Sequence, residues 1–315
     1  MHYLWITSTL AFVMAQAIPE HAGKQAIAPN LSDANTEILE LEEERNERMT
    51  VPVTIDGIGP YDFMIDTGSQ ATVVTHKIND QLGLESLGMT TLVGMASRRS
   101  VEVVGLDSLE VGQRTFNNLV APVLERKNIG ADGIIGLDSL QDLRVLFDFR
   151  NNTIAVGDVE SDFNSKDFEI VVRARQKLGQ LLITNAVIKG VRTTVIIDTG
   201  AQASLGNLAL RDRLRTKHSQ EVRTKDVNGV SMIGQLSYVR SLTIQNISLR
   251  DVPITYADAP AFEALGLQDK PVLSLGMQHL KMFDRVAIDF SKQRILFDLP
   301  REVERNPRKR RTSRM

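Results

Sequence analysis

The sequence predicts a mostly-β protein built from two homologous lobes that face each other across a pseudo-two-fold axis. Three sequence blocks recur in the same order in the two halves of the 315-residue chain, and such an internal repeat indicates a repeated structural unit. The blocks are short, apolar and rich in β-branched residues, a composition that favours strands. The tripeptide Asp-Thr-Gly stands at the same place in both copies, at residues 66–68 and 198–200.

The first block is a strand pair that leads into each Asp-Thr-Gly. Residues 51–65 and residues 181–197 are both apolar, β-branched runs that are interrupted once by a glycine-containing turn. Two such runs joined by a short glycine turn predict a β-hairpin. We expect the second strand of each hairpin to end at the aspartate.

The second and third blocks follow later in each copy. An apolar run that ends in glycine continues into a further strand at residues 133–149 and 272–290, and a closing strand follows at residues 152–156 and 293–297. We expect a short helix directly after the glycine in each copy. Short strands separated by frequent turn residues argue for mostly-β lobes.

The repeat sets the expected domain boundaries. They are a first lobe at residues 48–158, a polar linker at 159–169 and a second lobe at 170–300. A glutamate-rich leader, residues 18–47, precedes the lobes, and a basic tail, residues 301–315, follows them. Both are typical of solvated segments, although the leader could instead be a masking pro-segment and the tail could contact an anionic surface.

The N-terminal residues predict an export signal. The apolar run of residues 3–14 is followed at residues 15–17 by Ala-Gln-Ala, a small-x-small cleavage pattern. The run is too short to span a bilayer comfortably. We therefore expect a signal peptide at residues 1–17 and an exported protein, periplasmic or secreted. An uncleaved anchor and a misplaced start codon are the alternatives.

The composition argues against several function classes. A net charge of -2 gives no whole-chain case for nucleic-acid binding. The absence of cysteine excludes disulfides, thiolate metal sites and a cysteine nucleophile. No metal-ligand spacing connects the five histidines, His2, His21, His76, His218 and His279. We expect no metal, no cofactor, no nucleic-acid partner and no stable membrane span.

The repeated Asp-Thr-Gly predicts a pair of cooperating carboxylates, Asp66 and Asp198. One such tripeptide means little, but two at matching places in a repeat would meet on the two-fold axis. Two adjacent carboxylates share one proton because both cannot easily ionise. The pair then offers a base that activates water and an acid that protonates a carbonyl oxygen.

The residues that follow each aspartate are expected to support its loop. Glycine lets the backbone turn tightly beside the carboxylate, and a threonine hydroxyl can hydrogen-bond across to the partner loop. The residues that we expect to support the dyad are Thr67, Gly68, Ser69, Thr199, Gly200 and Ala201.

On these residues the chain resembles the aspartic protease superfamily, and in particular its retropepsin-like branch. Residues 65–69 and 197–201 are similar to the two active-site loops of that family, and residues 134–136 and 275–276 to its apolar-apolar-glycine signature. The resemblance covers roughly residues 48–299. It implies an aspartic endopeptidase with two β-barrel lobes in a bilobal acid-protease fold, a cleft for an extended peptide and a flap above it.

The short lobes favour the retropepsin-like branch. Each lobe keeps a segment between its aspartate loop and its late glycine that could form a flap, as in a retropepsin dimer fused into one chain. We therefore expect a monomer. The candidate flap residues are Gly94, Met95, Gly229 and Val230. Neither tip has the tyrosine or the glycine-rich run of known flaps, and Ser274 replaces an apolar residue of the signature, so flap geometry and substrate preference stay open.

One difference between the copies predicts an asymmetric dyad. Ser69 follows the first glycine, whereas Ala201 follows the second. A hydroxyl that donates to Asp66 would favour its ionised form. The prediction is that Asp66 carries the charge more often and Asp198 the shared proton.

Two other interpretations stay open. The chain could be a catalytically silent peptide-binding module with the same fold. It could also be a structural β-protein with fortuitous Asp-Thr-Gly turns, but this does not explain why three blocks repeat.

Overall fold

The computed structural model describes residues 49–158, 168–216 and 219–300. It also places the backbone of three short strands, Tyr3–Trp5 (β1), Thr36–Glu40 (β2) and Glu42–Glu43 (β3). The predicted signal peptide, leader and basic tail otherwise lie outside the described residues, as does the predicted linker up to residue 167. β2 and β3 pair with strands of the first lobe, so this part of the predicted leader is strand.

The first lobe is built on a nine-stranded sheet in the order β1-β7-β8-β9-β6-β10-β5-β4-β3. β8 also pairs with β4, so the sheet curls back on itself. The elements of this lobe are Met49–Ile55 (β4), Ile58–Ile65 (β5), Val73–Thr75 (β6), His76–Leu82 (α1), Ser86–Val93 (β7), Arg98–Val111 (β8), Arg114–Leu124 (β9), Arg126–Ile129 (α2), Gly133–Ile135 (β10) and Leu137–Leu140 (α3).

The second lobe repeats this plan in an eight-stranded sheet, β14-β15-β16-β21-β17-β20-β19-β18. The extra pairing of β15 with β19 matches that of β4 with β8. The elements of this lobe are Arg175–Lys177 (β14), Gln180–Ile188 (β15), Val191–Ile197 (β16), Leu205–Gly206 (β17), Leu208–Leu214 (α4), Gln220–Lys225 (β18), Ser231–Ile244 (β19), Ile247–Tyr256 (β20), Pro260–Ala264 (α5), Val272–Leu275 (β21) and Met277–Leu280 (α6).

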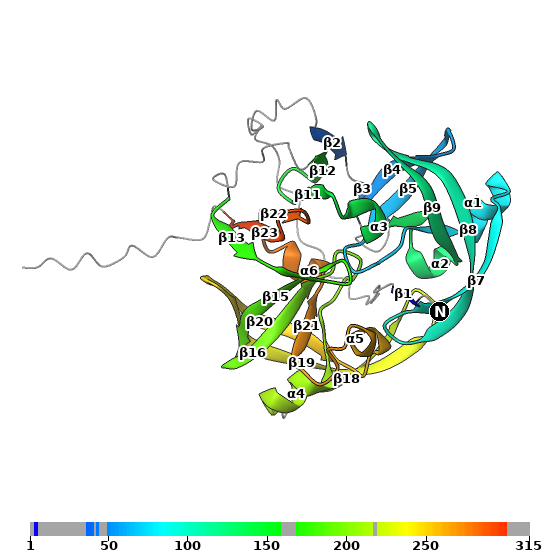
Figure 1. Ribbon diagram of the computed structural model, residues 1–315. Helices are drawn as coiled ribbons and strands as arrows, with labels where there is room; N and C mark the ends of the chain where they lie inside the picture. Colours follow the sequence, from blue (N-terminus) through cyan, green and yellow to red (C-terminus); the bar gives the residue numbers. More distant parts are fainter. Residues whose placement is uncertain are drawn as a thin grey trace, which may run out of the picture.

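A third sheet joins the lobes. Its order is β13-β23-β22-β11-β12-β2, so strands of both lobes lie side by side in it (Figure 1). Its remaining strands are Leu143–Asp148 (β11), Thr153–Asp158 (β12), Ile170–Arg173 (β13), Arg285–Asp289 (β22) and Arg294–Asp298 (β23). At its centre Leu146 of β11 faces Ala287 of β22, and the pairings on either side are mirrored, with Arg144 opposite Asp289 and Asp148 opposite Arg285. The pseudo-two-fold axis passes through this strand pair.

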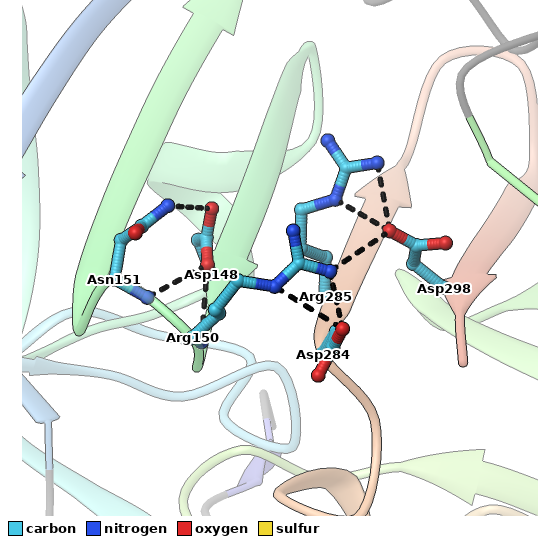
Figure 2. Close-up of polar contacts among 6 residues, drawn as sticks. All are labelled: Asp148, Arg150, Asn151, Asp284, Arg285 and Asp298. Atoms are coloured by element: carbon cyan, nitrogen blue, oxygen red, sulfur yellow. Dashed lines mark hydrogen bonds and ion pairs between the residues drawn. The ribbon is translucent and has the colours of Figure 1, made fainter. Parts of the chain in front are cut away.

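Charged side chains fasten this sheet. Nη2 of the buried Arg144 lies 3.1 Å from Oδ2 of Asp289. Figure 2 shows the outer network, in which Arg150 of the first lobe pairs with Asp284 and Asp298 of the second. Such partly exposed pairs are worth up to about 1 kcal/mol each, but here they connect the two lobes directly.

The predicted fold is confirmed: the protein is mostly β, with two homologous lobes. The two short helices expected after the late glycines are α3 and α6. One large hydrophobic cluster runs through both lobes and the shared sheet, and includes Val53, Phe147, Ile183 and Phe297. No helix among the described residues is long and apolar enough to cross a membrane.

Candidate functional site

Each aspartate of the predicted dyad directly follows a central strand, Asp66 after β5 and Asp198 after β16. A neighbouring parallel strand holds each one in place. The Asp66 N–H donates to Ile135 O of β10 at 3.0 Å, and the Asp198 N–H donates to Leu275 O of β21 at 3.1 Å. Both aspartates are fully buried. The lobes therefore present their carboxylates from equivalent, rigid positions.

The two aspartate loops interlock through their threonines. The Thr67 N–H donates to Thr199 Oγ1 at 3.1 Å, and the Thr199 N–H donates to Thr67 Oγ1 at 3.2 Å. The Thr67 hydroxyl donates to Ile197 O and the Thr199 hydroxyl to Ile65 O, both at 2.8 Å. The hydrogen bonds across the loops that the sequence predicted for these threonines are thus present in both directions.

This interlock places the Asp66 carboxyl group against the loop that carries Asp198. A Cβ atom added at Gly200 would lie only 2.1 Å from the carboxyl carbon of Asp66. The Asp66 carboxyl therefore rests on the backbone of the loop that carries Asp198. Any side chain at residue 200 would displace it, which explains the glycine.

Backbone donors hold one oxygen of each carboxylate. Asp66 Oδ1 accepts from the N–H groups of Gly68 at 2.7 Å and Ser69 at 3.1 Å, and Asp198 Oδ1 accepts from the N–H of Ala201 at 3.0 Å. These donors favour the charged form of a carboxyl group.

The role predicted for the Ser69 hydroxyl is wrong. Its single hydrogen is donated to Ala71 O at 2.7 Å, so it is not available to Asp66. A nearby carbonyl competes successfully for this short side chain. A hydroxyl does reach a carboxylate, but in the other lobe: Ser274 of β21 donates to Asp198 Oδ2 at 2.7 Å. The sequence showed Ser274 as a departure from the apolar signature but did not predict this contact.

The glycine of the apolar-apolar-glycine signature allows close packing beneath each loop. A Cβ atom at Gly136 would lie 2.3 Å from the Ala71 carbonyl, and one at Gly276 would lie 2.6 Å from Ala203 O. The next residue in each lobe then donates its N–H to the loop, to Ser69 O and Ala201 O respectively, both at 2.8 Å.

Different side chains support the two loops from below. In the first lobe Thr72 binds the carboxylate of Asp138, and burial raises the pKa of Asp138. In the second lobe Ser204 Oγ lies 2.6 Å from His279 Nδ1, and burial lowers the pKa of His279 to about 4. Ser204 and His279 are each only 1% exposed, so this serine–histidine pair has no access to a substrate.

The candidate flap residues lie at the tips of two β-hairpins, one from each lobe. Gly94 and Met95 form the turn between β7 and β8, and Gly229 and Val230 form the turn between β18 and β19. In Figure 1 the β7–β8 hairpin of the first lobe extends toward β18 of the second.

The two tips are bonded to each other through Asp226. Its Oδ2 accepts from the Ala96 N–H at 3.1 Å and the Ser97 hydroxyl at 2.6 Å, both of the opposite hairpin. Its Oδ1 accepts from the N–H groups of Asn228 and Val230, both at 3.0 Å, in its own turn. One buried carboxylate therefore organises both tips.

Each tip also buries apolar side chains in the opposite lobe. Val227 is fully buried in a cluster with Met64 and Ile134 of the first lobe. Val93 and Met95 belong to a cluster with second-lobe residues such as Leu205. Between the first tip and the Asp198 loop the structure leaves a cavity of about 10 Å³, lined by Met95, Ala201, Leu205, Asp226 and Met232 among others. That is roughly the space of one water molecule.

The predicted site residues thus fall into two groups. The dyad and its loop residues lie together in the interlocked loops, and the four flap candidates lie at the paired tips. Ser274 and Asp226 were missed, although serine in an apolar run and aspartate before an Asn-Gly turn were visible signals. Within the described ranges no three histidine or acidic side chains gather as metal ligands.

Comparison with known families gives one result that bears on this site. A family model described as aspartyl protease matches residues 51–139 and again residues 184–279. The two matches contain Asp66 and Asp198 respectively, so each lobe matches on its own. A search of curated proteins finds no match.

Proposed function

This chain belongs to the aspartyl protease family, and from that premise we propose that it is an aspartic endopeptidase that hydrolyses peptide bonds with Asp66 and Asp198. The observation that carries the proposal is the reciprocal threonine interlock, because it ties together the two loops that carry the buried Asp66 and Asp198 of separate lobes. A structural turn would need neither the second copy nor the contact between copies.

The proposed reaction uses the two carboxyl groups in complementary states. The ionised one removes a proton from a water molecule as the water oxygen attacks the scissile carbonyl carbon. The protonated one gives its proton to the carbonyl oxygen, which forms a neutral tetrahedral diol. The carboxyl that took the water proton then passes it to the amide nitrogen, while the other carboxylate removes a proton from a diol hydroxyl. The carbon–nitrogen bond breaks, the acid and amine products form, and the pair again holds one proton.

The proposed substrate is a peptide in extended conformation between the carboxylates and the hairpin tips. Strands bind extended peptides through main-chain hydrogen bonds. The present contact between the tips leaves space for about one water molecule over the Asp198 loop. Binding would therefore require the tips to separate.

The first prediction tests this function by cleavage of a broad peptide library. Asp66→Asn and Asp198→Asn should each reduce kcat by at least about a thousandfold, because an amide cannot take part in the proton exchange. The matched control is Asp251→Asn, an exposed aspartate of β20 in the second lobe, which should cleave like the parent protein. Cleavage that survives either dyad substitution would contradict the mechanism.

A catalytically silent peptide-binding module is the second candidate function, and the divergent tips, which have neither the tyrosine nor the glycine-rich run of known flaps, favour it. The two candidates differ in one measurement. A binding module would retain library peptides without cutting them, and its affinity would survive Asp66→Asn and Asp198→Asn.

We further propose that the protein is exported and acts as a monomer. The repeat supplies both halves of the site within one chain, so no second copy is needed. N-terminal sequencing of the mature protein, with a start near Ile18, and the mass in solution test these two points.

A further inference from the structure

We propose that Ser274 is a positioning residue that keeps the negative charge of the dyad on Asp198, so that Asp198 acts as the base and Asp66 carries the proton. This inference rests on the proposed function for its catalytic meaning. It reverses the asymmetry that the sequence predicted.

The contact itself is short and shielded. Ser274 Oγ lies 2.7 Å from Asp198 Oδ2, and Ser274 and Asp198 are 2% and 0% exposed. Ser274 lies on β21, directly beside Ile196 of β16, the strand that leads into Asp198. The serine is therefore held by a strand pair, and water does not compete with its hydroxyl for the carboxylate.

The equivalent position of the first lobe carries a side chain without a hydroxyl. The late glycines align Ser274 with Ile134, which is fully buried in an apolar cluster with Met64. The Ser69 hydroxyl of the first lobe is bound to Ala71 O. The Ser274 hydroxyl thus distinguishes Asp198 from Asp66.

The pattern of donors fits this assignment. Asp198 accepts hydrogen bonds on both oxygens, from the Ala201 N–H and from Ser274, which suits a carboxylate with charge on both oxygens. The two backbone donors to Asp66 both reach Oδ1.

Other titratable groups surround the dyad, and the test has to separate them. Lys225 and Asp226 line the cavity beside Ala201 on the side of the hairpin tips. Asp138 and His279 lie beneath the two loops, where they bind Thr72 and Ser204. None of these four groups is removed by a change at residue 274, so a shift caused by that change reports on the dyad.

The experiment compares pH–rate profiles of Ser274→Ala, Ser274→Thr and the parent protein. Loss of a hydrogen bond to a charged group should move the acidic limb of kcat/KM upward by about one pH unit in Ser274→Ala. Ser274→Thr keeps a hydroxyl and should restore the limb. Ser237→Ala, a buried strand serine of the same lobe away from the dyad, is the control.

A second measurement does not depend on activity. Carbon NMR of labelled aspartate carboxyls, with signals assigned through Asp66→Asn and Asp198→Asn, should show Asp198 ionising at lower pH than Asp66 in the parent protein. Earlier ionisation of Asp66, an unmoved acidic limb in Ser274→Ala, or an equal shift in Ser237→Ala would each overturn the inference. If the parent cleaves no peptide, the proposed function fails and the NMR titration alone decides the role of Ser274.

Discussion

At the scale of single residues, Ser69 and Ser274 show how far the local sequence determines which hydroxyl groups bind the carboxylates. Asp66, Asp198 and their threonines could be predicted because each acts within a short motif that the repeat duplicates. The hydrogen-bond donors to the two carboxylates could not all be predicted. Whether a hydroxyl reaches a carboxylate depends on competing acceptors in space, and Ser69 and Ser274 resolve that competition in opposite ways.

His279 supplies a second prediction at this scale, concerning stability and pH. Burial lowers the pKa of His279 to about 4 from an unfolded value of 6.5, so the unfolded chain takes up a proton first as the pH falls. The stabilising contribution is present above pH 6.5 and is lost toward pH 4, at a cost of about 3 kcal/mol. His279→Asn should flatten the dependence of unfolding free energy on pH between these values.

Urea unfolding at several pH values measures this effect. His76→Asn, at an exposed helix position, is the control and should keep the parent slope. The raised pKa of Asp138 acts in the opposite direction, because protonation of that carboxyl stabilises the fold as the pH falls. Asp138 is present in the parent protein and in both histidine variants, so its contribution cancels when their slopes are compared. A His279→Asn slope equal to that of the parent protein would show that the histidine does not titrate in this range.

At the scale of elements, the two hairpins were predicted in position but not in contact. Glycine turns between strands identify hairpin tips from sequence alone. The pairing of the tips is different, because Asp226 and Ser97 are 129 residues apart in the chain. Only the two-fold arrangement of the lobes brings them together, and no local pattern encodes it.

The third prediction tests the contact between the tips. Asp226→Asn is nearly isosteric, but its amide offers one acceptor oxygen where the carboxylate accepts four hydrogen bonds. Loss of charge-assisted hydrogen bonds at a buried site costs roughly 1.5–3 kcal/mol each. Amide hydrogen exchange at residues 94–98 and 226–231 should therefore accelerate at least about tenfold. Asp258→Asn, an exposed change in the same lobe, should leave this exchange unaltered. Equal exchange in both variants would show that Asp226 does not hold the two tips together.

At the scale of the whole molecule, the shared sheet makes the two lobes one structural unit. The repeat predicted two lobes and a two-fold relation, because the sequence pattern indicates equivalent strands in both copies. It did not predict that β11 and β22 would pair with Arg144 opposite Asp289, because strand order between lobes depends on long-range packing that composition does not record.

The last prediction concerns this joint. Burial opposes ionisation of Asp289, but hydrogen bonds from Arg294 and the Lys292 N–H, with the charge of Arg144, hold its pKa below the usual value. Arg144→Leu removes one cation from a buried ion pair and leaves Asp289 less compensated, which should cost about 3 kcal/mol of unfolding free energy. Because the pair joins the lobes, both should lose stability together in a single transition, followed by circular dichroism and by hydrogen exchange in each lobe. Arg173→Leu, at an exposed position of the same sheet, is the matched control. Separate transitions for the two lobes, or a loss confined to one of them, would mean that the lobes are independent domains and that the shared sheet does not couple the two halves of the site.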